Sequence, residues 1–304
     1  MKNVCVTDVY IDIDGLAAMV AYAELLNKIG EPAAAMSRAP FNASIPSEMR
    51  TWSFNITNPD ERKPGDTYTF VDISNPDYLP SWADNVTEIV DHHPGYEEYW
   101  RERISDGAQI EPIGAATTLI WEKWRDGRRL EQMSELSARL MVCAILDQTL
   151  DFQAGVTTER DRAAYDDCLA RVNFDGDLRE WYFSSATAEI EHDLANSIKN
   201  DTKELTIPSF AEPINTAQLA AWNGADFWRR HRANLLEILG KEKWLLNLID
   251  ISGCRSQFVT NDKSIAEIIT KLTGVQFDEQ GIAVAKRPWL RKEIVRAGIE
   301  YAKS

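Results

Sequence analysis

The sequence predicts an α/β protein whose first domain is built on a parallel sheet. Apolar runs of strand length occur at residues 1–6, 68–71 and 86–90, and an amphipathic helix predicted from Leu16 to Gly30 follows the first run. This alternation of strand and helix favours parallel strands joined by right-handed crossovers. Aspartates stand near the ends of all three runs, where open α/β sheets carry their functional groups.

The elements after these strands are predicted mainly as helices. Four prolines indicate loops and short elements over residues 37–66. Apolar spacing then predicts helices at residues 114–126, 130–147 and 157–172, and the last of these opens with a capping-type sequence. The first domain is therefore expected to be a parallel sheet followed by helices that cover it.

A second, smaller α+β domain is predicted after a polar, largely helical stretch at residues 173–205. Its expected elements are a helix at 227–239, strands at 244–249 and 257–259, a helix at 264–272, a strand at 282–285 and a helix ending at Ala302. We place the first domain at residues 1–190, a connector at 191–205 and the second domain at 206–304.

The composition is that of a globular protein without a membrane or secretory segment. Of the 304 residues, 44% are hydrophobic and 27% charged. No apolar stretch reaches transmembrane length, and the N-terminus lacks the apolar core of a signal peptide. The four cysteines lack metal-ligand spacing and are expected to be buried thiols. We therefore expect a cytoplasmic protein that does not bind membranes, and either a monomer or a homodimer.

A candidate metal centre is predicted around Asp91-His92-His93-Pro94, which follows the apolar run at 86–90 and holds two of the four histidines. Adjacent histidines alone are typical of ordinary polar loops, so the prediction depends on nearby aspartates. Asp12, Asp14 and Asp72 would converge with this sequence at one edge of a parallel sheet. Several carboxylates beside an imidazole repel one another unless cations lie among them, and oxygen-rich sites suit Mn²⁺ or Mg²⁺ better than Zn²⁺.

In this order and at these intervals, Asp12-x-Asp14, Asp72 and Asp91-His92-His93 resemble the first three motifs of the DHH phosphoesterase superfamily. Residues 111–120 resemble the small-residue segment that follows, and residues 144–152 with 157–161 resemble the fourth motif and the next helix start. These later segments look closest to the family II inorganic pyrophosphatase and exopolyphosphatase branch. The resemblance implies two Mn²⁺ or Mg²⁺ ions held by the following residues: Asp12, Asp14, Asp72 and His92. It also implies that His93, with Asp91, is catalytic and faces the phosphate.

Two positions depart from the pattern of that branch. Asp8 stands where the branch has a metal-binding histidine, although a carboxylate can also bind Mn²⁺ or Mg²⁺. In the fourth motif, Gln148 occupies the position of the family aspartate, and the carboxylate is one residue earlier, at Asp147. Either Asp147 reaches the metal or one ligand is lost. Asp8 and Asp147 complete the predicted ligand set.

The charge is divided between the two parts of the chain. The first 200 residues carry a net charge of −17, whereas residues 201–304 carry +2, which together give the −15 of the whole chain. The second domain has a basic run that resembles the substrate-clamping segment of the pyrophosphatases, and charge-assisted hydrogen bonds from such residues hold phosphate oxygens. The predicted substrate-binding residues are Arg255, Lys286, Arg287, Arg291 and Lys292. Any one of these side chains could instead be an ordinary solvated charge.

Three functions from different classes follow from these observations. The first is a metal-dependent phosphohydrolase acting on pyrophosphate, short polyphosphate or a similar small substrate, with the active site in a cleft between the domains. The second is a phosphodiesterase for short oligonucleotides or cyclic dinucleotides, for which Trp181, Tyr182, Trp228 and Trp289 could stack bases. The third is a degenerate member that binds a ligand without turnover. The acidic chain argues against long nucleic acid as a partner.

Overall fold

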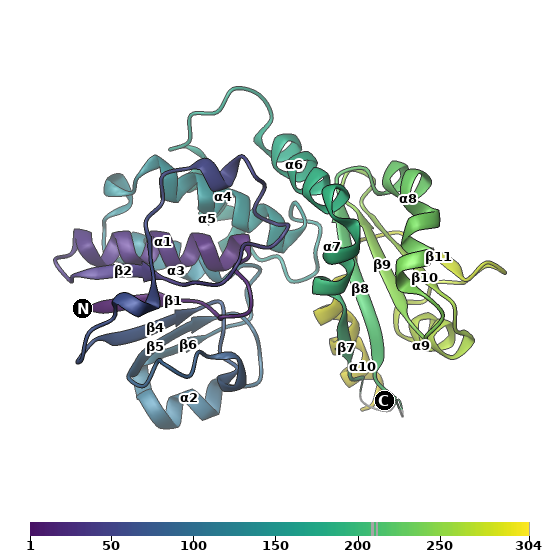
Figure 1. Ribbon diagram of the computed structural model, residues 1–304, viewed down its shortest axis with the longest axis horizontal. Coiled ribbons are helices and arrows are strands. Elements are labelled where there is room, and N and C mark those ends of the chain that lie inside the picture. Colours follow the sequence, from purple (N-terminus) through teal and green to yellow (C-terminus); the bar gives the residue numbers. More distant parts are fainter. Residues whose placement is uncertain (208–209, 211, 304) are drawn as a thin grey trace. The chain divides into compact units, whose positions relative to one another are not determined.

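The computed structural model describes residues 1–207, 210 and 212–303, which form two compact units (Figure 1). The N-terminal unit contains residues 1–152 and 156–179, and the C-terminal unit contains residues 153–155 and those from Glu180 onward. The stretch predicted as a connector, residues 191–205, lies within the C-terminal unit and carries helix α7 (Leu194–Asp201) and strand β7 (Lys203–Leu205).

The N-terminal unit is built on a six-stranded sheet with the order β3-β2-β1-β4-β5-β6. Every neighbouring pair in this sheet is parallel, as the sequence predicts. The strands are β1 (Lys2–Cys5), β2 (Ala33–Met36), β3 (Ile56–Thr57), β4 (Thr67–Val71), β5 (Val86–Asp91) and β6 (Ala108–Ile110). The chain order reverses between β1 and β4, so the carboxyl ends of these two strands flank the switch point of the sheet.

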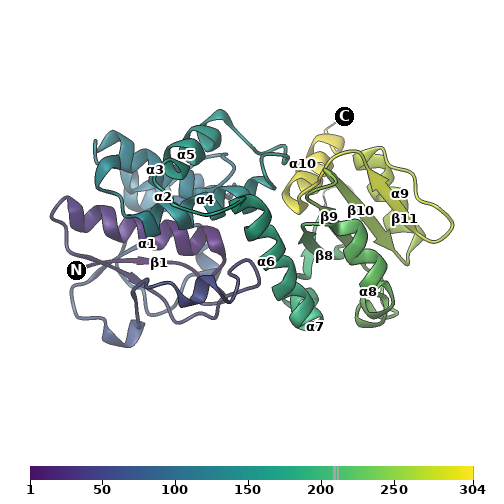
Figure 2. The same cartoon turned by 90° about the horizontal axis from the view of Figure 1, so that it is seen from above.

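Helices cover both faces of this sheet. Helix α1 (Ile13–Lys28) is alanine- and leucine-rich, and it packs against β1, α3 (Ala116–Asp126) and α4 (Glu135–Thr149). Figures 1 and 2 both show α1 running along the sheet, on the same side as α3, α4 and α5 (Glu159–Leu169). On the opposite face, Trp100 of α2 (Glu97–Ile104) packs with Met36, Phe70 and Ile89. Short 3₁₀ turns lie at residues 49–51, 59–61, 76–78, 105–107 and 130–132.

The C-terminal unit contains a mixed five-stranded sheet with the order β11-β10-β9-β8-β7. Its central pair, β8 (Ile214–Ala221) and β9 (Leu245–Asp250), is parallel, and the outer pairs are antiparallel. The other elements are α6 (Leu178–His192), α8 (Gly224–Leu239), β10 (Arg255–Thr260), α9 (Lys263–Thr273), β11 (Ile282–Ala285) and α10 (Arg291–Tyr301). Apolar residues of α9 and α10, among them Ile269 and Ile294, share a core with Leu245 and Phe258 of the sheet.

Two features of the composition can be checked in the fold. Cys5, Cys143 and Cys168 are buried free thiols, as expected, whereas Cys254 is free but exposed because it lies in the turn between β9 and β10. Among the described residues, no helix combines the length and the apolar character that a membrane crossing requires.

Candidate metal centre

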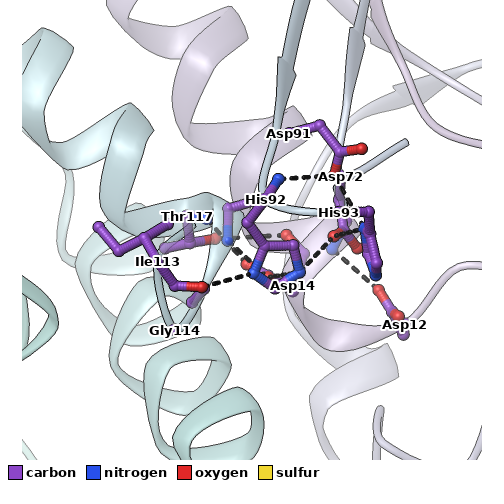
Figure 3. Close-up of polar contacts among 12 residues, drawn as sticks. Asp12, Asp14, Asp72, Asp91, His92, His93, Ile113, Gly114 and Thr117 are labelled. Carbon is purple, nitrogen blue, oxygen red and sulfur yellow. Dashed lines mark hydrogen bonds and ion pairs between the residues drawn. The ribbon is translucent and has the colours of Figure 1, made fainter. Parts of the chain in front are cut away.

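The predicted metal ligands and catalytic residues lie at the carboxyl edge of three adjacent strands. Asp72 directly follows β4, Asp91 is the last residue of β5, and Asp12 lies between β1 and α1 as the residue that caps the helix. Because β1, β4 and β5 are parallel neighbours, their carboxyl ends bring these side chains to one place. Figure 3 shows Asp12, Asp14, Asp72, His92 and His93 gathered there.

A glycine allows two of these carboxylates to approach the same helix end. Oδ1 of Asp12 accepts a hydrogen bond from the backbone N–H of Gly15 at 2.9 Å. A Cβ atom at Gly15 would lie 3.2 Å from that oxygen, 3.6 Å from Oδ2 of Asp72 and 3.0 Å from Val6. Asp72 itself has a φ of 58°, in the left-handed region that few non-glycine residues adopt, although aspartate adopts it more often than most. The turn after β4 thus holds Asp72 in an unfavourable backbone conformation at the site.

Asp14 is fully buried, and the start of α3 holds its carboxylate. The backbone N–H groups of Ala116 and Thr117 donate to its two oxygens at 2.8 and 2.9 Å. Even so, burial and the negative charge of Asp12 raise the pKa of Asp14 to about 7. Burial and the charges of Asp12 and Asp14 likewise raise the pKa of Asp72 well above its ordinary value. Carboxylates that destabilise one another in this way favour a cation among them.

His92 is oriented so that one ring nitrogen faces these carboxylates. Its Nδ1 lies 3.2 Å from the backbone carbonyl of Ile113, and because a carbonyl can only accept, Nδ1 carries the proton. In the neutral ring the lone pair is then on Nε2, which lies 3.3 Å from Oδ1 of Asp72 and 3.9 Å from Oδ2 of Asp14 (Figure 3). An imidazole fixed by a backbone carbonyl through one ring nitrogen, with the other nitrogen directed at carboxylates, is the usual arrangement of a histidine metal ligand.

The spacing and the chemistry of these atoms fit a divalent cation. Two ligands at right angles around an octahedral Mg²⁺ or similar ion, each about 2.1 Å from it, lie about 3 Å apart. One atom each from Asp72, Asp91, His92 and His93 lies within 4.8 Å of the others. Within the described part of the chain, Oδ1 of Asp72 and Oδ2 of Asp91 are buried and receive no hydrogen bond. This group of four residues has two carboxylates and two imidazoles and does not include Asp12 or Asp14. The predicted ligand set of Asp12, Asp14, Asp72 and His92 offers mostly oxygen with one imidazole, which suits Mn²⁺ or Mg²⁺.

Asp91 and His93 form a second pair beside the ligands. Oδ1 of Asp91 accepts hydrogen bonds from Nδ1 of His93 at 2.8 Å and from the backbone N–H of His92 at 2.7 Å. Although burial opposes it, the hydrogen bond from His93 lowers the pKa of Asp91 below its ordinary value. The side chain of His93 is 54% exposed, whereas that of Asp91 is completely buried. Asp91 thus orients the imidazole, and Nε2 of His93 is left to meet a ligand.

Asp8 and Asp147 are the predicted ligands at the two positions that differ from the family pattern. Oδ2 of Asp8 accepts a hydrogen bond from the indole N–H of Trp82 at 3.0 Å and lies 3.7 Å from Arg38, while its Oδ1 is buried and receives no hydrogen bond from a described residue. Asp147 is half-buried in the last turn of α4. Burial and the negative charge of Asp147 raise the pKa of the Cys143 thiol one turn earlier. The roles of Asp8 and Asp147 as metal ligands stay predictions.

The predicted basic residues lie in the C-terminal unit, and each of the three arginines contacts a carboxylate there. Arg255 lies 2.8 Å from Asp250, Arg287 lies 2.8 Å from Glu293, and Arg291 lies 2.8 Å from Asp201. Only 16% of the Arg291 side chain is exposed, whereas Arg255 and Arg287 are 43% and 44% exposed. Lys286 is exposed and Lys292 half-buried. These pairs show how the arginines are oriented within their own unit.

The groups that support the predicted ligands from behind are not evident from the sequence. The loop from Ile113 to Thr117 contacts both His92 and Asp14, but it does so through backbone groups, which leave no signal of residue type. Asp161 of α5 holds the same loop with its carboxylate. The capping-type sequence at the start of α5 forms a capping box in the structure, with Thr158 as the cap and Asp161 as the third helical residue, but this motif does not predict the contact of Asp161 with the loop.

Comparisons with known proteins bear on this geometry. No protein-family profile matches the chain. A protein of Deinococcus radiodurans named as a manganese-dependent inorganic pyrophosphatase is 25% identical over 311 residues, covering 93% of each chain. One of Lactobacillus johnsonii with the same name is 25% identical over 222 residues, or 71% of this chain and 68% of the relative. The chain is thus similar in sequence to proteins named as manganese-dependent inorganic pyrophosphatases.

Similar solved structures share the fold of this chain. A Methanococcus jannaschii protein assigned to the family II inorganic pyrophosphatases superimposes with a TM-score of 0.68 at 15% identity, covering 98% of this chain and 100% of the other. An exopolyphosphatase-related protein from Bacteroides fragilis superimposes with a TM-score of 0.53 at 11% identity, covering 99% and 92%. The relatives confirm the predicted resemblance to this superfamily, and the solved structures confirm the predicted α/β fold class.

Proposed function

We propose that this protein is a divalent-metal-dependent phosphohydrolase that cleaves a P–O bond in pyrophosphate, short polyphosphate or a similar small substrate. The observation that carries the proposal is the position of Nε2 of His92, 3.3 Å from Oδ1 of Asp72 and 3.9 Å from Oδ2 of Asp14. An imidazole nitrogen directed at buried carboxylates is suited to holding a cation, and the relatives described above are named as manganese-dependent enzymes.

The residues proposed to hold the metal are Asp12, Asp14, Asp72 and His92, with Asp8 and Asp147 as further ligands if two ions are bound. A bound divalent ion supplies an activated water at neutral pH and neutralises charge on the transferred phosphoryl group. The carboxylates keep fixed positions because backbone N–H groups hold Asp14 and Asp12, and the turn after β4 holds Asp72. The site is thus preorganised by hydrogen bonds that do not involve the metal.

His93 is proposed to act on the phosphate. Its Nδ1 is engaged by Asp91, so Nε2 of the half-exposed ring is the atom that can contact a substrate oxygen. In the doubly protonated form, Nε2 donates a hydrogen bond to that oxygen and can pass its proton to the leaving group. The buried carboxylate of Asp91 keeps the ring in this orientation, which is the role that an orienting aspartate has beside catalytic histidines.

Charge supports a small substrate over a long nucleic acid. The first 200 residues, which provide every proposed metal ligand, carry a net charge of −17. A strongly acidic surface offers no row of cations to replace the counterions of a polynucleotide. Of the aromatic residues considered for stacking bases, Tyr182 is completely buried and so cannot serve. Arg255, Lys286, Arg287, Arg291 and Lys292 remain the proposed contacts for phosphate oxygens.

Phosphate release from a substrate panel tests this proposal. The panel is pyrophosphate, tripolyphosphate, a phosphomonoester, a dinucleotide and a cyclic dinucleotide, each with Mn²⁺, Mg²⁺ or EDTA. We expect turnover of pyrophosphate or tripolyphosphate that EDTA abolishes and that His92→Ala reduces severely, while His192→Ala, at an exposed position, retains it. Preference for a dinucleotide would favour the phosphodiesterase. No turnover by folded, metal-loaded protein would favour a degenerate, ligand-binding member.

A further inference from the structure

We propose that Asp161 is a positioning residue of the metal centre, because it fixes the loop that orients two ligands arising from different elements. The proposal rests on the metal-dependent function above and extends it to a side chain that does not touch the metal ligands. Asp161 lies on α5, and its carboxylate is completely buried.

The carboxylate of Asp161 accepts five hydrogen bonds from neutral donors. Its Oδ2 accepts from the backbone N–H of Gly114 at 3.1 Å and from the N–H and hydroxyl of Thr158, both at 2.8 Å. Its Oδ1 accepts from the N–H of Ala115 at 3.2 Å and from the hydroxyl of Thr118 at 2.7 Å. An asparagine has only one acceptor oxygen, so only a carboxylate can satisfy this whole set.

The hydrogen bonds made by residues 113–118 go alternately to the predicted metal ligands and to Asp161. The carbonyl of Ile113 accepts from Nδ1 of His92, and the next two N–H groups, of Gly114 and Ala115, donate to Asp161. The N–H groups of Ala116 and Thr117 donate to Asp14, and the hydroxyl of Thr118 donates to Asp161. One short segment therefore sets the position of a histidine that follows β5 and of an aspartate on α1.

The contact between the loop and Asp161 is close enough to transmit small displacements. A Cβ atom at Gly114 would lie 2.6 Å from Oδ2 of Asp161 and 2.8 Å from Thr149, so only a glycine fits without movement. Loss of the carboxylate would release the loop and turn the Ile113 carbonyl away from His92. Nδ1 would then no longer be held as the protonated nitrogen, and the lone pair on Nε2 would be present only part of the time.

The test is Asp161→Asn, measured without any substrate. In metal-free protein labelled with ¹⁵N-histidine, we expect wild type to show His92 protonated at Nδ1, and the variant to show a mixture of tautomers. Mn²⁺ titration followed by electron paramagnetic resonance should give a Kd raised by about 10- to 100-fold, the usual effect of losing groups that hydrogen-bond the ligands, because Asp161 holds the loop that carries those groups. The matched control is Asp262→Asn, which removes another aspartate that caps a helix, in the C-terminal unit.

A second variant keeps the proposal testable if Asp161→Asn does not fold. Thr118→Val removes one of the five hydrogen bonds with almost no change of volume, and it should shift the tautomer and Kd in the same direction by a smaller factor. Unchanged His92 signals and unchanged Mn²⁺ affinity in a folded variant, even with a lower Tm, would overturn the positioning role. Because the tautomer is read in metal-free protein, this result is independent of whether the wild type hydrolyses the panel substrates.

Discussion

Nε2 of His92 lies 3.3 Å from Oδ1 of Asp72, and the two side chains come from the ends of neighbouring parallel strands. This ring nitrogen is directed at the carboxylate of Asp72. Burial and the adjacent aspartates raise the pKa of that carboxyl group. Asp72 should therefore support metal-dependent activity but not the stability of the metal-free protein. The two effects can be measured separately.

Asp72→Asn should lower activity by about 10²-fold or more, because a weakened ligand reduces the stabilisation of transition-state charge by several kcal/mol. The same substitution removes one of the mutually repelling carboxylates, so the free energy of unfolding of metal-free protein should stay equal or increase. Enzyme assays and urea unfolding in EDTA check the two parts. Asp77→Asn, at an exposed position nearby, should change neither. Loss of stability with full activity would show that Asp72 is structural.

His93→Gln should separate catalysis from metal binding. The exposed ring contacts Asp91 through Nδ1 and offers Nε2 to the substrate, so its removal should reduce kcat by about 10²- to 10⁴-fold, the usual range for a general acid. Mn²⁺ affinity should change little, since His92 retains its contacts with Ile113 and Asp72. Calorimetric Mn²⁺ titration beside steady-state kinetics makes the comparison. A parallel loss of Mn²⁺ binding would instead identify His93 as a ligand.

Removal of metal should lower the Tm of the protein. A cation that binds only the folded state stabilises it by about 2.7 kcal/mol when its concentration is 100 times its Kd. The effect should be larger with Mn²⁺ than with Ca²⁺, because the site supplies an imidazole nitrogen and Ca²⁺ prefers oxygen ligands. Calorimetry in EDTA, Mn²⁺ and Ca²⁺ measures this order. Equal Tm values in EDTA and in excess Mn²⁺ would contradict a metal centre.

Glu88 should make the stability of the N-terminal unit depend on pH. Its carboxylate receives the hydroxyl of Tyr22 at 2.7 Å and lies 3.1 Å from Nζ of Lys123. Although burial opposes the shift, the charge of Lys123 and the hydrogen bond from Tyr22 lower the pKa of Glu88. A lowered carboxyl pKa contributes stability that is present above the ordinary pKa, near 4.5, and is lost as the pH falls through the folded-state value.

Glu88→Gln should therefore reduce the free energy of unfolding by about 1–3 kcal/mol at pH 7. The difference from wild type should shrink as the pH falls below about 4.5, because the wild-type side chain then becomes neutral as well. Urea denaturation at pH 7, 4 and 3 gives the three values, with Glu98→Gln as an exposed control. A difference that stays constant over this range would contradict the assigned role.

The strands and helices predicted from the sequence are those with strong apolar patterns. The run at 86–90 is β5, and the helix predicted from Leu16 begins three residues earlier because Asp12, rather than a later residue, caps it. Strand β2 was missed because its sequence, Ala33-Ala34-Ala35-Met36, has little intrinsic preference for a strand. Strand β8 was missed for a similar reason, since Ile214–Ala221 contains three alanines and depends on pairing with β7 and β9.

The part of the site that consists of side chains at strand ends could be predicted from the sequence, whereas the contacts made by backbone groups could not. Aspartates at the ends of parallel strands must meet at one edge, so Asp12, Asp72 and Asp91 could be placed together from the sequence. The tautomer of His92 depends on a carbonyl 21 residues away, and no pattern of residue types specifies that contact. The contact between Arg291 and Asp201 could not be predicted either, because the two residues are 90 positions apart in the sequence.

The left-handed backbone of Asp72 has a consequence for how the chain folds. A glycine there would relieve the turn after β4, and a neutral side chain would relieve the repulsion, so local preference and ligand chemistry conflict at this residue. Such a conflict is local frustration in an otherwise consistent folding landscape. We expect this edge of the sheet to be the last part of the N-terminal unit to become ordered during folding, and its ordering to be accelerated by Mn²⁺ in the refolding buffer.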